Sequence, residues 1–133
     1  MIKPTHKGVT APSRYQEQND CSVRSIANAK NITYEEAHNL LKSLGREDGS
    51  TTSDRSVAIA CVTLGGKLKL FHNDYQEQHQ IVAKTFKRYL PYLQTGKFVV
   101  IMSNHTFCLI DGCIIDDRCI NEAEITTCAY EFK

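Results

Sequence analysis

The sequence has no uninterrupted run of about 18 apolar residues, the length that a helix needs to span a membrane. Residues 1–8 also lack the apolar stretch of a secretory signal. We therefore expect no membrane partner and a cytoplasmic location, which would be the host cytoplasm if the chain is viral.

An excess of charge of one sign is also missing, because 16 basic residues are balanced by 15 acidic ones, and no block of like charge occurs. Proteins that bind nucleic acids usually carry a basic stripe and have an isoelectric point above the value of about 7.6 found for this chain. We therefore expect no nucleic-acid partner. The charge balance leaves a protein or peptide substrate open, and it does not bear on the oligomeric state.

Low-complexity segments and internal repeats are absent as well. With 133 residues, of which 41% are hydrophobic, the chain is long enough to bury one core of its own. We predict a single domain over residues 1–133.

The six cysteines are predicted to be free thiols, because a chain without a secretory signal folds where disulfides are rare. Cys61, Cys108 and Cys113 stand among apolar residues and are expected to be buried. Cys21 differs from them, because its neighbours in NDCSVRS are polar.

Capping residues and apolar residues at helical spacing predict four helices in the first two-thirds of the chain. The capping box formed by Thr33 and Glu36 makes the second of them the clearest. Pro91 interrupts the pattern of the fourth, which extends to Leu93. The first helix is expected over residues 21–30, and the caps are Asn19 or Asp20, Thr33, Ser53 and Thr85.

The remaining pattern predicts strands over residues 67–71, 97–102, 106–110, 113–116 and 123–132. Asp111-Gly112 is a strong hairpin signal. Because helices precede most of the strands, we predict an α+β fold in which N-terminal helices pack on a C-terminal antiparallel sheet.

Cys21 is the best candidate for a reactive group. The thiolate is the nucleophile, and the unpaired backbone N–H groups at a helix N-terminus favour this anion. Cys21 begins the predicted helix and so stands where a reactive thiol is expected.

A thiol nucleophile needs a base within hydrogen-bond reach, usually from a distant part of the chain. His105 stands at the mouth of an apolar strand, where it can face a cleft. His38 falls on the polar side of its helix. Solvated or capping roles are expected for the other four histidines, which are His6, His38, His72 and His79.

The predicted hairpin brings a carboxylate next to His105. With Asp111 and Gly112 at the turn, Phe107 faces Asp116, and alternate side chains share one face of the sheet. Asp116 is then the diagonal neighbour of His105 and can orient its ring, which is the third role in a catalytic triad. A register slip by one residue would put Asp117 there instead.

Acyl transfer also needs donors that stabilise an oxyanion, usually a backbone N–H and a side-chain amide. The backbone N–H of Cys21 is one candidate. Gln16 and Gln18 both precede the helix, and Gln16 leaves more chain to fold back over the helix start.

The order of these residues resembles that of papain-like cysteine peptidases, in which the nucleophile begins a long helix and the histidine and carboxylate come from a later sheet. NDCSVRSIANA resembles the helix motif of small papain-like proteins of bacteriophages and bacteria, and it is similar to the cysteine motif of OTU-type deubiquitinases. GKFVVIMSNHTFCLIDGCIIDD resembles the histidine hairpin of the family. The match covers residues 16–30 and 96–117, and Ser22 departs from the glycine that often follows the cysteine.

The resemblance implies a thiol protease or related hydrolase that cleaves a peptide or isopeptide bond without cofactor or metal. Cys21, His105 and Asp116 are then catalytic, and Gln16 matches the glutamine that serves the oxyanion. One alternative is an inactive papain-like protein that binds a protein, such as a phage factor that binds a host protein. A second is a zinc module, although His105 and Cys108 would point to opposite sides of their strand.

Overall fold

The computed structural model describes residues 1–15, 17–71 and 85–133. Short 3-10 turns, η1 and η2, cover Ser13–Tyr15 and Leu90–Tyr92. The helices and strands are, in chain order, α1 Cys21–Lys30, α2 Tyr34–Ser43, α3 Asp54–Thr63, β1 Lys67–Phe71, α5 Phe86–Tyr89, β2 Lys97–Met102, β3 Thr106–Ile110, β4 Cys113–Ile115 and β5 Thr126–Phe132. Among the described residues, no helix has the length and apolarity required to cross a membrane.

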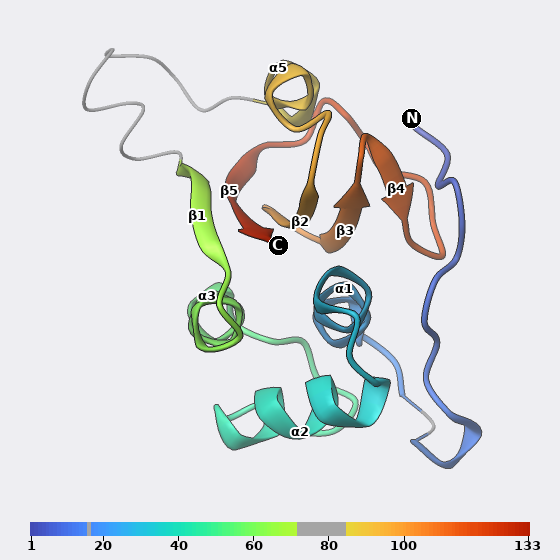
Figure 1. Ribbon diagram of the computed structural model, residues 1–133. Helices are drawn as coiled ribbons and strands as arrows, with labels where there is room; N and C mark the ends of the chain where they lie inside the picture. The colour runs from blue at the N-terminus through green and yellow to red at the C-terminus, as the bar shows by residue number, and fades with distance from the viewer. Residues whose placement is uncertain (16, 72–84) are drawn as a thin grey trace.

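The five strands form one sheet in the order β1-β5-β2-β3-β4, and all neighbours are antiparallel. Helices α1 and α3 lie against one face of this sheet with α2 beneath them, whereas α5 lies on the opposite face (Figure 1). The predicted α+β fold is confirmed at this level. The hairpin register is also confirmed, because Ile110 pairs with Cys113 and Cys108 with Ile115.

The central strands β2 and β3 are buried on both faces of the sheet. Val99, Ile101 and Cys108 pack against the apolar residues of α1, α2 and α3. On the other face, Phe98 and Phe107 pack with Phe86 of α5. Strand β2 alternates between two cores, and its residues after Lys97 are all apolar and buried. Each large side chain that it buries contributes roughly 1.5–3 kcal/mol.

Helix α1 has the predicted bounds, but its entry differs from the prediction. Asp20 occupies the N-cap position without a side-chain cap hydrogen bond. Asn19 has a φ of 57°, a left-handed conformation that asparagine tolerates better than most residues. The Asp20 carboxylate is therefore free to bind other groups.

Helix α2 confirms the capping box, in which the Glu36 backbone N–H donates to Thr33 at 3.1 Å. The expectation that His38 is solvated or caps a helix is wrong, because this side chain is buried. Glu17 and the ring of Tyr15 lie over the side of the helix that carries His38, which the spacing of apolar residues within the helix cannot reveal.

Three other boundaries differ from the sequence prediction. The fourth helix ends at Tyr89, and a 3-10 turn follows it, because Pro91 cannot donate a backbone hydrogen bond. Strand β4 ends at Ile115, and β5 begins only at Thr126.

The N-terminal segment runs along the edge of the sheet beside β4 (Figure 1). Ile2 pairs with Ile120, and His6 pairs with Ile115. The backbone N–H of Asp116 donates to the His6 carbonyl at 3.0 Å. This pairing covers an exposed strand edge and fixes the backbone that carries Asp116.

Candidate active site

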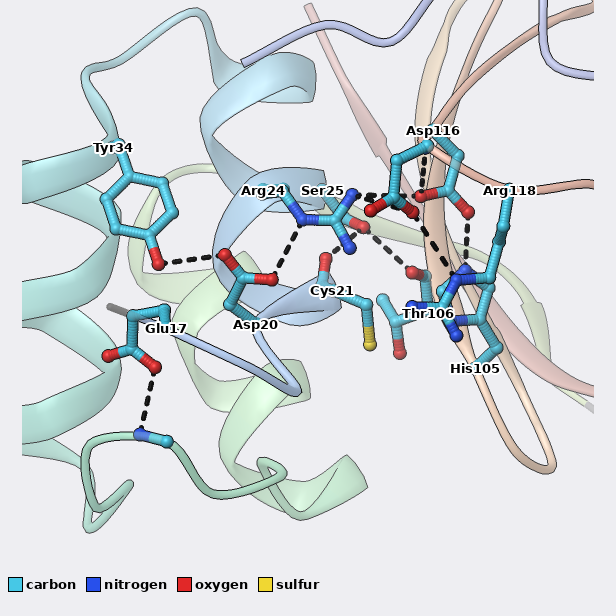
Figure 2. A network of polar contacts seen from close by, with 12 residues as sticks. Glu17, Asp20, Cys21, Arg24, Ser25, Tyr34, His105, Thr106, Asp116 and Arg118 are labelled. Atoms are coloured by element: carbon cyan, nitrogen blue, oxygen red, sulfur yellow. Dashed lines mark hydrogen bonds and ion pairs between the residues drawn. The ribbon is translucent and has the colours of Figure 1, made fainter. Parts of the chain in front are cut away.

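Cys21 is the first residue of α1, and its side chain is partly buried. Figure 2 shows its sulfur directed from the helix start towards Thr106 and His105, where β3 begins. The predicted nucleophile and base, 84 positions apart in the chain, therefore lie beside one another.

A hydroxyl group ties α1 to β3 at this point. The Ser25 Oγ lies 2.6 Å from the Cys21 carbonyl oxygen and 3.0 Å from the Thr106 carbonyl oxygen. Ser25 is buried, so water competes little for these bonds. The contact holds the residue that follows His105 at a fixed distance from the residue that carries the sulfur.

The His105 ring is held by Asp116. Its Nε2 donates to Oδ2 of Asp116 at 2.5 Å, which leaves Nδ1 as the ring nitrogen for the sulfur of Cys21. Asp117, the alternative that a register slip would select, lies instead beside Arg24 and Arg118, each at 3.4 Å. The structure thus brings Asp116, rather than Asp117, against the histidine.

Hydrogen bonding and charge favour the ionised forms of Cys21 and His105. Burial raises the pKa of Cys21, but hydrogen bonds from His105 and from the Thr106 backbone N–H outweigh it, so that the pKa is lowered overall. Burial lowers the pKa of His105, but Asp116 and Cys21 together raise it to about 9. The pKa of Asp116 is lowered, because His105 and Arg24 outweigh its burial. A thiolate next to an imidazolium is the result.

The other buried cysteines lack such a partner. Burial raises the pKa of Cys61 and of Cys108 to about 12, and that of Cys128 to about 11. All six cysteines are free, as predicted, but Cys113 is only partly buried. Among the four thiols for which a shift is resolved, Cys21 alone has a lowered pKa.

Arg24 is a site residue that sequence reasoning missed. It is 5% exposed, and its guanidinium lies between two carboxylates, with Nη1 at 3.0 Å from Asp116 and Nε at 3.0 Å from Asp20. Tyr34 donates to the other oxygen of Asp20 at 2.9 Å. The available signal was a charged residue three positions after Cys21, close to one helical turn and on the side that packs inward.

A cavity of about 300 Å³ opens in front of the sulfur. Its walls come from the starts of α1 and α3 and from the turn between β2 and β3. Its lining residues are Cys21, Ser22, Thr51, Thr52, Asp54, Met102, Ser103, Asn104, His105 and Thr106. Both Cys21 and His105 are therefore accessible to a ligand of modest size.

The predicted oxyanion residue Gln16 lies outside the described residues. Gln18, the alternative, is exposed and does not line the cavity. His72 and His79 also lie outside the described residues. The backbone N–H of Cys21, in the first turn of α1, stays available as an oxyanion donor.

The residues considered for zinc do not come together. Among the described residues, one group of at least three potential ligands has all its ligand atoms within 4.8 Å of one another, and it consists of Glu17, His38 and Asp48. Arg46 already binds both oxygens of Glu17, at 2.9 and 3.3 Å. His105 and the cysteines form no such group.

No family model, no curated protein and no solved structure matches the chain.

Proposed function

We propose that this protein is a papain-like cysteine hydrolase that cleaves a peptide or isopeptide bond through an acyl-enzyme on Cys21. The observation that carries the proposal is the chain of contacts from Cys21 through His105 to Asp116, whose Cys21 end opens on a cavity. A thiolate, a protonated base and a carboxylate that orients it are the parts that nucleophilic acyl transfer requires.

The first half of the reaction forms the acyl-enzyme. The Cys21 thiolate attacks the carbonyl carbon, and the carbonyl π electrons move to the oxygen, which accepts a hydrogen bond from the Cys21 backbone N–H. Gln16 is the proposed second donor. The C–N bond then breaks as the oxyanion collapses, and His105 gives its proton to the leaving amine.

The second half releases the product. Neutral His105 takes a proton from water, and the water oxygen attacks the thioester carbon. The C–S bond breaks, and the acid product leaves. The thiolate and the imidazolium are thereby restored, and Asp116 stabilises the ring whenever it is charged.

Selective alkylation tests whether Cys21 is activated. The protein is treated with a limiting amount of iodoacetamide between about pH 6 and 8, and the labelled cysteines are identified by peptide mapping. We expect Cys21 to react well before Cys119, the exposed cysteine that serves as an internal control. Equal rates for the two thiols would contradict the proposal and favour a papain-like protein that only binds its partner.

Acyl transfer is tested with p-nitrophenyl acetate, an activated acyl donor that makes no demand on substrate specificity. We expect a burst of nitrophenolate and an acetyl group on Cys21, detected by mass spectrometry. The Cys21→Ala variant should show neither signal while keeping its circular dichroism spectrum. An unchanged burst in that variant would contradict the mechanism.

A further inference from the structure

The cavity in front of Cys21 has one wall that the reaction itself does not use. Thr51, Thr52 and Asp54 form this wall, at the start of α3. Asp54 is the first residue of the helix, and Ser53 caps it by accepting from the Ser56 backbone N–H at 3.2 Å. The position of Asp54 is therefore fixed by a helix rather than by a free loop.

The charges that line the cavity are unbalanced. Within residues 1–15, 17–71 and 85–133, Asp54 is the one acidic residue of the lining, and no lysine or arginine lines the cavity. In that part of the chain, the one cation of the lining is the imidazolium of His105, which Cys21 and Asp116 already neutralise. A ligand in the cavity consequently meets one uncompensated negative charge.

The Asp54 carboxylate has no ion pair and no hydrogen bond among the described residues. The residue is exposed on the cavity wall, and the burial of one side of its carboxylate raises the pKa of this group. Burial also raises the pKa of Cys128 in β5, and the charge of Asp54 adds to that effect, which puts the carboxylate near the sheet. An unpaired carboxylate on the wall of a cavity favours a cationic ligand and repels an anionic one.

A second cavity indicates which half of the substrate meets Asp54. It measures about 170 Å³ and shares His105, Met102 and Asn104 with the first, but Cys21 does not line it. Because His105 protonates the leaving amine, the leaving half of a substrate extends towards this second cavity. The acyl half then lies along the wall that carries Asp54.

We propose that Asp54 is a specificity residue that binds a lysine or arginine side chain in the acyl half of the substrate, within two residues of the scissile bond. The preferred substrate is thus a basic peptide segment. This inference rests on the proposed function, because it needs an acyl half that is bound to Cys21.

Matched irreversible probes test the inference. The probes are acetyl-dipeptides whose last residue carries a chloromethyl ketone. One of the two residues is lysine, glutamine or glutamate, and the other is alanine. The thiolate displaces chloride, so that a C–S bond forms and the C–Cl bond breaks, and the rate constant is measured from the mass of the adduct. At one of the two positions we expect the wild type to prefer lysine over glutamate by about tenfold, the effect of a partly shielded ion pair.

The variants of Asp54 give the decisive comparison. The lysine-to-glutamate ratio should fall to about threefold or less in Asp54→Asn, invert in Asp54→Lys and be retained in Asp54→Glu. Glu47→Gln is the matched control, since it removes one exposed negative charge from the preceding loop outside the cavity, and its ratio should equal that of the wild type. Each ratio is taken within one folded variant, so general changes in thiol reactivity cancel.

A ratio that is the same in the wild type, Asp54→Asn and Asp54→Lys would overturn the inference. The proposed function is judged separately by iodoacetamide. If Cys21 is reactive but the lysine-to-glutamate ratio does not depend on Asp54, the specificity alone is refuted. An unreactive Cys21 refutes the proposed hydrolase as well.

Discussion

Two histidines of this protein stand in similar polar networks and differ in what lies beyond them. His105 contacts Asp116, which is backed by Arg24. His38 contacts Glu17 at 2.9 Å, which is backed by Arg46 at 2.9 Å. In both networks a buried arginine compensates a buried carboxylate next to a histidine.

The difference lies at the second nitrogen of each ring. Nδ1 of His105 is left for a thiol that opens on a cavity. Nδ1 of His38 is buried and has no hydrogen-bond partner among the described residues, and the ring of Tyr15 packs over it with centroids 4.6 Å apart. A histidine, a carboxylate and an arginine therefore make a structural cluster. A nucleophile and access for a ligand are what turn such a cluster into a candidate catalytic site.

Removal of the nucleophile should have the largest effect. Cys21→Ala should lower hydrolysis of p-nitrophenyl acetate by at least about a thousandfold, because the proposed acyl-enzyme forms on the sulfur that this variant lacks. His105→Ala should approach the same loss. Cys119→Ala, which removes an exposed thiol, is the control and should retain activity within about twofold. A Cys21→Ala variant that keeps its activity would remove the distinction between the two networks.

Loss of the carboxylate should have a smaller effect and should shift the pH profile. Because the pKa of His105 is raised to about 9, hydrolysis of an amide substrate by the wild type should fall as the pH passes 9, since the leaving amine needs the proton of the imidazolium. Asp116→Asn should lower activity by about a hundredfold and move this alkaline limb to lower pH. A rate profile measured from pH 5 to about 10 checks both effects. An alkaline limb that stays in place would contradict the assigned role of Asp116.

The same raised pKa has a consequence for stability. The contribution from the charged His105 is complete below its ordinary pKa of about 6.5, and it is lost as the pH rises through about 9. Denaturation by urea at pH 6 and at about pH 10 should therefore differ less in Asp116→Asn than in the wild type.

The two arginines should separate structure from chemistry. Arg24→Met and Arg46→Met should each lower the free energy of unfolding by about 3–5 kcal/mol, because each leaves a buried carboxylate without its partner. In folded protein, only Arg24→Met should also lower the alkylation rate of Cys21, by about tenfold, since Asp116 loses its support. Arg24→Lys should recover part of that rate. Equal effects of Arg24→Met and Arg46→Met on the rate would argue against a positioning role for Arg24.

His38→Gln should have the smallest effect on chemistry. It should lower the free energy of unfolding by about 1–3 kcal/mol, because contacts with Glu17 and Asp48 are lost in a buried position. The alkylation rate of Cys21 and its pH profile should match those of the wild type. A changed profile would mean that the two networks are coupled.

The parts of the site that follow from local pattern could be predicted from the sequence. The spacing of apolar residues after Asp20 defines α1, which puts Cys21 at a helix start. Asp111-Gly112 fixes the hairpin register, and this register brings Asp116 within reach of His105. Each inference uses only a few consecutive residues and a known side-chain period.

The parts that depend on packing between distant segments could not be predicted. Arg24 reads as an ordinary helix residue, and only the approach of β4 shows that it neutralises Asp116. Asp20 reads as an N-cap, but Tyr34 and Arg24 take up its carboxylate. The burial of His38 likewise depends on Glu17, 21 positions away in the chain.

The location of β5 has a consequence for how the chain folds as it is synthesised. This strand is made last of the five, yet it lies between β1 and β2 and pairs with both. Among the described strands, β1 has no other hydrogen-bonded neighbour, so it must wait for some sixty further residues before its edge is covered. Such a late, long-range insertion slows folding and leaves an unpaired edge in the nascent chain, where premature association with a second chain would begin.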